Sequence, residues 1–118
     1  MHPVTRSGMT YENKIHSISK RIAGAIPDTI KWNLTSAGSG LVSKVQAAHN
    51  SWVSVSAVYR CQHDNGRLYY VAIVSTRFSD TYAPKYITIF NMNLSIIGEF
   101  RFSMRTGKLV KEILNVIL

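Results

Sequence analysis

Two runs of alternating apolar and polar residues flank the pair Asn65-Gly66 and predict a β-hairpin over residues 52–77. Asn-Gly is a strong hairpin signal, because a two-residue type I′ turn needs positive φ at both central positions. Such a turn sets the register of the hairpin. Two residues that pair across it then have numbers that add up to 131, as Cys61 and Tyr70 do. One face of the hairpin is then apolar enough to form a core and carries Tyr59, Cys61, Tyr70 and Ala72.

The chain before this hairpin has the pattern of two helices separated by a short strand. Isoleucines at positions 15, 18, 22 and 26 have helical spacing and predict a helix over residues 10–26, which Pro27 ends. Alternating residues suggest a strand over residues 29–34. After a Gly- and Ser-rich loop, a helix is expected from Ser39 to about residue 50, with a buried side made of Leu41, Val45 and Ala48.

A second two-stranded unit and a last helix follow the hairpin. Alternating runs over residues 85–90 and 94–105 are separated by a turn near Asn91-Met92-Asn93, whose ambiguous length leaves the pairing register open. Gly98 lies in the second run and predicts a bulge or bend, which would curl the sheet. Thr106 is expected to cap a helix with one apolar stripe, made of Val110, Ile113, Leu114, Ile117 and Leu118.

These elements predict an α+β fold in a single domain over residues 1–118, with residues 1–9 as a loose leader. N-terminal helices come first, then a four-stranded antiparallel meander sheet that Gly98 could curl, then a C-terminal helix. The first and last helices are expected to cover the apolar sheet face. Curled ligand-binding sheets, ribonuclease toxin domains and small nucleic-acid-binding sheets share this outline, so the outline does not select a function.

Charge is the property in which this composition is unusual. Fourteen Lys and Arg residues stand against six Asp and Glu residues, which gives a net charge of +8. This surplus favours polyanionic partners, such as nucleic acid or an acidic protein, and disfavours basic ones. The single cysteine, Cys61, is expected to be a buried thiol in a reducing, cytoplasmic setting. No apolar run approaches the ~18 residues of a transmembrane helix, so none is expected.

The second face of the predicted sheet carries a basic and aromatic rim. Arginines bind phosphate groups and a tyrosine ring can stack on a base, so this face suits single-stranded nucleic acid. The residues expected to contact a polyanion are Arg60, Arg67, Tyr69, Arg77, Tyr86, Arg101 and Arg105. The simpler alternative is that they are ordinary solvated residues of an antiparallel sheet. The function predicted first is a small, non-enzymatic binding module for nucleic acid or another polyanion.

The centre of the same face is apolar and supports a second hypothesis. Five side chains are expected there without a covering helix, namely Val58, Val71, Ile73, Phe90 and Ile97. An exposed apolar patch of this kind marks an interface or a pocket. The second hypothesis is therefore a homodimeric interaction domain or a domain that binds a small ligand.

Two histidines provide a third hypothesis, a metal-independent ribonuclease or toxin domain. Acid–base cleavage of RNA needs two groups beside one phosphate that titrate near neutrality. His49, at the end of the second helix, and His63, at the hairpin tip, are the candidates. Each is also explained simply as a helix-end or a turn residue. No Cys and His spacing matches a metal site and no cofactor motif is present, so neither a metal nor a cofactor is expected.

Overall fold

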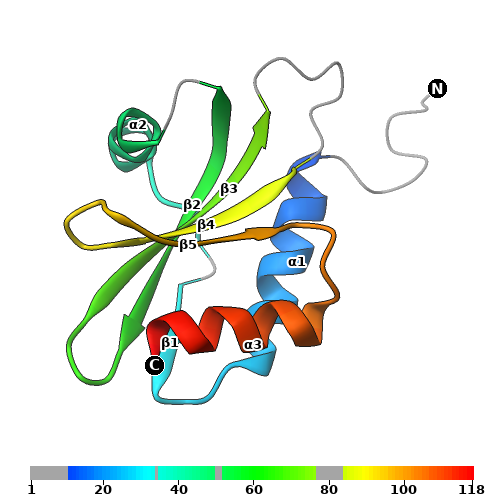
Figure 1. Cartoon of the computed structure of the whole chain (residues 1–118), viewed down its shortest axis with the longest axis vertical. Helices are drawn as coiled ribbons and strands as arrows, with labels where there is room; N and C mark the ends of the chain where they lie inside the picture. The colour runs from blue at the N-terminus through cyan, green and yellow to red at the C-terminus, as the bar shows by residue number, and fades with distance from the viewer. Residues whose placement is uncertain (1–10, 34, 50–51, 77–83) are drawn as a thin grey trace.

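The computed structural model describes residues 11–33, 35–49, 52–76 and 84–118, apart from the side chains of residues 11–16 and 18. In these residues the elements are α1 (Tyr11–Ala25), β1 (Ile30–Trp32), α2 (Ser39–Ala48), β2 (Val53–His63), β3 (Leu68–Thr76), β4 (Tyr86–Asn91), β5 (Ile96–Arg101) and α3 (Thr106–Ile117). The strands form one antiparallel meander in the order β1-β2-β3-β4-β5 (Figure 1). The predicted α+β class is confirmed.

The sheet differs from the prediction in having five strands rather than four. The extra strand is β1, the short alternating segment that the prediction leaves outside the sheet. It pairs with the last residues of β2, so that Trp32 lies opposite Cys61. Trp32 donates its Nε1 hydrogen to Ser19 Oγ at 2.7 Å, and its ring stacks on Tyr59 with centroids 6.3 Å apart. These contacts to α1 and β2 hold a three-residue strand that would be unstable alone.

Helices cover both faces of this sheet (Figure 1). The face under α1 and α3 forms the larger core, called here the α1/α3 core. Its buried residues are Ile22, Ile30, Ala57, Tyr59, Cys61, Tyr69, Val71, Ile73, Ile87, Ile89, Leu109, Val110, Ile113 and Ile117. The predicted covering of one sheet face by the first and last helices is confirmed.

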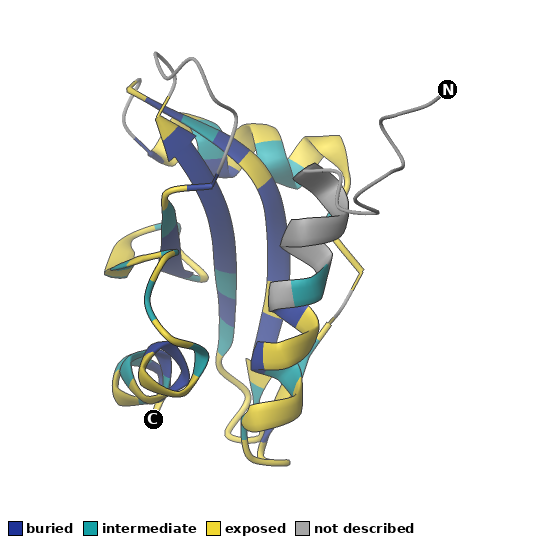
Figure 2. Ribbon diagram, turned by 90° about the vertical axis from the view of Figure 1, so that its right-hand side faces the viewer, coloured by how far each residue is buried: buried dark blue, intermediate teal, exposed yellow. Residues whose placement is uncertain are grey.

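The opposite face forms a smaller core beneath α2, called here the α2 core. Its buried residues are Val45, Val53, Val55, Val58, Ala72, Val74 and Phe90. Because β3 contributes to both cores, residues 71–75 are all buried, and Figure 2 shows the middle of the sheet in the buried colour. A strand that is buried on both faces has a continuous apolar run rather than an alternating one, as Val-Ala-Ile-Val at 71–74 has.

The predicted register of the first hairpin is wrong by one residue. Cys61 pairs with Tyr69 rather than Tyr70, because the loop contains three residues, 64–66, instead of two. The amide of Gly66 donates to His63 O at 3.0 Å, and only Gly66 in this loop has positive φ, at 93°. A type I turn followed by a left-handed glycine is the usual three-residue hairpin loop.

This shift exchanges the two faces of β3 while β2 keeps the predicted ones. Tyr59 and Cys61 are buried in the α1/α3 core as expected, but Tyr69 joins them there and Tyr70 lies on the α2 face. A one-residue slip has this effect because side chains alternate along a strand. A register shift between Val55 and Ala57 adds a second exchange, so Val55 belongs to the α2 core.

The second hairpin also contains an irregularity, close to the predicted place. Ile89 pairs with Gly98, whereas Phe90 pairs with Ile96, so Ile97 is the extra residue of a bulge. The predicted bulge is confirmed, but the expected curling is wrong, since the five-stranded meander is not curled. Of the predicted apolar helix faces, Ala48 and Leu118 are exposed, Ile15 and Ile18 lie outside the described side chains, and the other residues are buried or half-buried.

Candidate functional site

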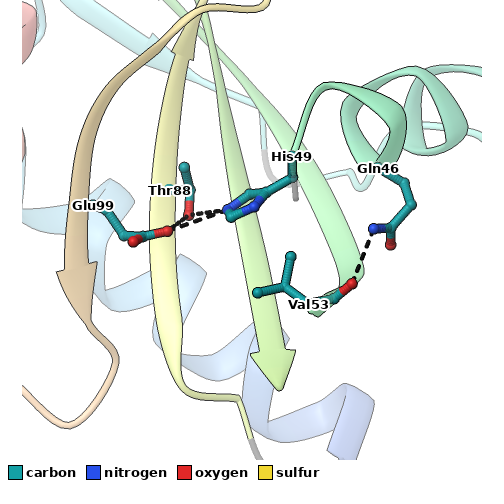
Figure 3. A network of polar contacts seen from close by, with 5 residues as sticks. All are labelled: Gln46, His49, Val53, Thr88 and Glu99. Carbon is teal, nitrogen blue, oxygen red and sulfur yellow. Dashed lines mark hydrogen bonds and ion pairs between the residues drawn. The ribbon is translucent and has the colours of Figure 1, made fainter. Parts of the chain in front are cut away.

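The α2 helix covers only part of its sheet face. Val45 is its one fully buried residue, and it packs over the α2 core. Gln46 fastens the helix to the start of β2, because its side-chain amide donates to Val53 O at 3.0 Å and accepts from the amide of Val55 at 2.8 Å (Figure 3 draws the first contact). Nearer the first hairpin, the same face carries exposed polar residues of β1 and β2.

This uncovered end of the α2 face forms a basic groove. Arg60 lies opposite Tyr70, and Lys31 lies opposite Gln62. A hollow of about 260 Å³ is lined here by Lys31, Trp32, Asn33, Arg60, Gln62 and Leu68, which we call the basic groove. The amide of Asn33 donates to Arg60 O at 2.9 Å, which continues the strand pairing and brings the wall of the groove beside β2.

Among the described residues, no Lys or Arg forms an ion pair with a carboxylate. All eleven Lys and Arg residues whose side chains are described are exposed. Both ion pairs among the described residues involve histidine, namely His49 with Glu99 and His63 with Asp64, and none involves Lys or Arg. The guanidinium of Arg60 and the ammonium of Lys31 therefore remain available to an external anion.

A neighbouring hollow marks where this positive surface ends. It is lined at the hairpin end by Asp28, Thr29, Lys31, Gln62, His63, Asp64 and Gly66. Lys31 borders both hollows, whereas the two aspartates border only this one. An anion would therefore be drawn toward the Arg60 side of Lys31.

The residues predicted to contact a polyanion do not form one surface. Tyr69 is 5% exposed and belongs to the α1/α3 core, so its ring is not available for stacking. Arg67 lies at the hairpin loop, beside a different cavity from that of Arg60. Tyr86 lies opposite Arg101, and a turn leads from Arg101 to Arg105 at the start of α3. Arg77 lies outside the described residues.

The predicted exposed apolar patch is not present on the surface. Val58 and Phe90 are buried in the α2 core, and Val71 and Ile73 are buried in the α1/α3 core. Ile97 alone is exposed, and it lies at the β5 bulge. The expectation was wrong because the shifted register sends the residues of β3 to the opposite faces and because α2 covers the centre.

The two candidate catalytic histidines lie on opposite faces of the sheet. His49 contacts Thr88 on β4. Thr88 pairs with Ala72 on β3, and Ala72 pairs with Val58 on β2, so His49 lies level with Val58 along the sheet. His63 lies on the face of Tyr59 and Cys61, five residues beyond Val58, so the separation along the strand alone is about 17 Å at roughly 3.3 Å per residue. The two rings are therefore too far apart to act on one phosphate.

His49 instead belongs to a polar network with Thr88 and Glu99 (Figure 3). The Thr88 hydroxyl donates to Glu99 Oε2 at 2.8 Å. His49 Nε2 lies 3.2 Å from both Thr88 Oγ1 and Glu99 Oε2, so the hydrogen on Nε2 is shared between these two acceptors. Thr88 is fully buried, so its hydroxyl is not accessible to a substrate, and the network anchors the end of α2 to the sheet.

Cys61 has the character of a buried thiol. It is fully buried, and burial raises its pKa to about 12, which keeps the sulfur protonated and poorly nucleophilic. Within the described part of the chain, no three His, Cys, Asp or Glu side chains are placed to hold a metal ion. No helix there is long and apolar enough to cross a membrane.

Sequence reasoning missed Lys31, which lines the basic groove, and Tyr70, which lies opposite Arg60 on the same face. Tyr70 was placed on the wrong face by the assumed two-residue loop. Asp64 before Asn65-Gly66 was a signal for a longer loop, because Asp-Asn-Gly also suits a type I turn with a left-handed glycine. Lys31 was missed because the short strand that carries it was not assigned to the sheet.

Comparison with known proteins finds no matching family model, and neither a curated protein nor a solved structure matches the chain.

Proposed function

We propose that this protein is a small, non-enzymatic module that binds single-stranded nucleic acid through the basic groove. The observation that supports this most strongly is the pairing of Arg60 and Lys31 in one hollow, both exposed and without a carboxylate partner among the described residues. Phosphate contacts supply most of the affinity in sequence-independent binding. The net charge of +8 would add to this attraction over a longer range.

Tyr70 would supply the second component of single-strand binding. It lies directly across from Arg60, and it is half-buried against the α2 core. A ring held in this way loses little conformational freedom when a base stacks on it. A reducing, cytoplasmic location, where RNA is abundant, would suit the buried thiol of Cys61.

Oligonucleotide binding by charge variants tests this proposal. Arg60→Ala and Lys31→Ala should each weaken binding to a mixed-sequence RNA 15-mer, as measured by fluorescence anisotropy. The log–log salt slope should flatten by about 0.7 for each phosphate that a variant no longer binds. The matched control is Lys20→Ala, which removes the same charge from an exposed position on α1. Equal effects of all three variants, or no binding by the wild type at low salt, would reject the groove as the site.

Stacking is tested separately with Tyr70→Leu, which keeps an apolar side chain against the α2 core. It should weaken single-strand binding by about 1–3 kcal/mol and leave the salt slope unchanged. An acidic protein surface would use the same cations but would not depend on the ring. Loss of affinity in the charge variants alone would therefore indicate a polyanion other than single-stranded nucleic acid.

A further inference from the structure

A second cavity borders the basic groove at Leu68 and has a different character. It has a volume of about 600 Å³ and is lined by the start of β3, the β4–β5 turn and the end of α3. Its lining residues are Arg67, Leu68, Tyr69, Asn91, Met92, Asn93, Ile97, Asn115 and Val116. We propose that it binds a small amphipathic organic anion, with an aromatic-sized apolar body and one carboxylate, sulfonate or phosphate group.

The inner wall of the cavity is apolar and is held in place by packing. Tyr69 borders the cavity but is almost fully buried, and its hydroxyl donates to Ile117 O at 3.4 Å, which ties the start of β3 to the end of α3 behind this wall. Next to the cavity, β5 touches α3 closely at Gly98, where an added Cβ would lie 3.1 Å from Val116 Cγ2. This close approach keeps Val116 in position as a wall, and Ile97 beside it is exposed.

The rim of the cavity favours a negative charge. Arg67 is the only charged residue of the lining, it is exposed, and it has no ion-pair partner among the described residues. The other polar lining groups are the amides of Asn91, Asn93 and Asn115. Asn91 is occupied in the turn, because its Oδ1 accepts from the amides of Asn93 and Ser95 at 3.0 Å each. The exposed amides of Asn93 and Asn115 can donate to an anionic group held by Arg67.

Size and composition together select the class of ligand. The volume falls within the range of about 300–1,000 Å³ that is typical of small-molecule sites, which are mostly apolar with a few placed polar groups. A macromolecular polyanion would make little use of the apolar wall, whereas an uncharged apolar molecule would leave Arg67 without an anionic partner. This site uses Arg67 rather than Arg60, so it goes beyond the proposed function and does not depend on it.

Paired probes that differ only in charge test this inference. The probes are 1-naphthaleneacetate and its neutral amide, each titrated into the isotope-labelled full chain and followed by NMR. Saturable backbone shifts should be confined to residues 67–69, 91–97 and 115–116. The acid should bind about fivefold more tightly than the amide, as expected for one ion pair at an exposed rim. Dispersed shifts, or none, would overturn the proposal.

Two variants locate the charge and the apolar body. Arg67→Gln should abolish the difference between acid and amide, while Lys108→Gln, an exposed cation in the first turn of α3, should preserve it. Asn115→Trp adds a large side chain at the exposed rim and should reduce binding of both probes at least tenfold, with the remaining spectrum unchanged. A persistent acid preference in Arg67→Gln, or unchanged binding in a folded Asn115→Trp, would show that this cavity is not the site.

Discussion

The two faces of the sheet differ in how completely they are covered. The α1/α3 face is closed by two helices, and it buries residues from every element except α2 and β5. The α2 face is covered by one helix of ten residues, which is anchored through Gln46 and His49 and leaves the hairpin end exposed. The basic groove lies where this cover stops. The first face provides stability, whereas the second divides its area between packing and exposed polar surface.

This difference explains why a chain rich in apolar residues exposes cationic residues on one part of its sheet. Residues of β3 contribute to both cores, so the centre of the sheet is buried on both faces and carries no exposed apolar patch. At the hairpin end, beyond the reach of α2, β1 and β2 carry the exposed polar residues Lys31, Arg60 and Gln62. The placement of one short helix therefore decides which part of this sheet face is exposed to solvent.

The largest expected effect is on the closed face. Ile113 is fully buried in the α1/α3 core, and Ile113→Ala should lower the free energy of unfolding by about 2–5 kcal/mol, measured by urea denaturation. Val45→Ala, the corresponding deletion on α2, should cost less, because it removes one carbon fewer than Ile113→Ala and the smaller core can collapse around it. An equal or larger loss for Val45→Ala would show that the two faces contribute alike.

The next effect concerns the loop that assigns the β3 residues to the two faces. Gly66 has φ of 93°, which a β-branched residue resists, so Gly66→Val should destabilise by about 1–2 kcal/mol although no atom lies near the added Cβ. Gly24→Ala is the matched control, since it lies in α1 with nothing within 4 Å of its added Cβ. That change should stabilise the helix by up to about 1 kcal/mol. A neutral Gly66→Val would contradict the three-residue loop.

The burial of Cys61 in the closed face predicts a dependence on pH. The folded-state pKa of about 12 lies above the ordinary value of 9.0, so the folded protein retains the thiol proton that the unfolded chain loses. The resulting stabilisation is complete below pH 9 and is lost as the pH rises from 9 through 12, at up to about 1.4 kcal/mol per pH unit. The stability difference between wild type and Cys61→Ala, measured by urea denaturation, should therefore shrink between pH 8 and pH 10.

Tyr59 does not obscure this comparison. Burial raises its pKa as well, an effect that its hydrogen bond with Ser19 partly offsets, but the residue is present in both proteins and its contribution cancels. A stability difference that stays constant over this pH interval would mean that Cys61 is exposed to solvent.

The smallest expected effect is on the α2 face. Thr88→Val keeps the shape of the buried side chain but removes the hydroxyl that joins His49 to Glu99, and it should cost about 1 kcal/mol. Hydrogen exchange should become faster in α2 and remain unchanged in α3, because the network anchors only α2. Faster exchange in both helices would indicate that the two faces unfold as one unit.

Local patterns in the sequence were sufficient for the elements and for the class of fold. The helical spacing of apolar residues located α1 and α3, and the alternation in β2 assigned Tyr59 and Cys61 to the correct face. These features depend on neighbouring residues alone, since a periodic stripe must be buried wherever the element packs. Of the candidate site, the exposure of Arg60 was predicted in the same way.

Tertiary structure decided which residues meet across the sheet. The choice between a two-residue and a three-residue loop depends on which face of β3 packs under the helices, and a single step exchanges Tyr69 with Tyr70. The addition of β1, which brings Lys31 beside Arg60, depends on its pairing with β2 and on Trp32 packing against α1. The sequence alone thus determined the elements and the surplus of positive charge. The grouping of those charges into a groove required contacts between distant segments, which no local pattern encodes.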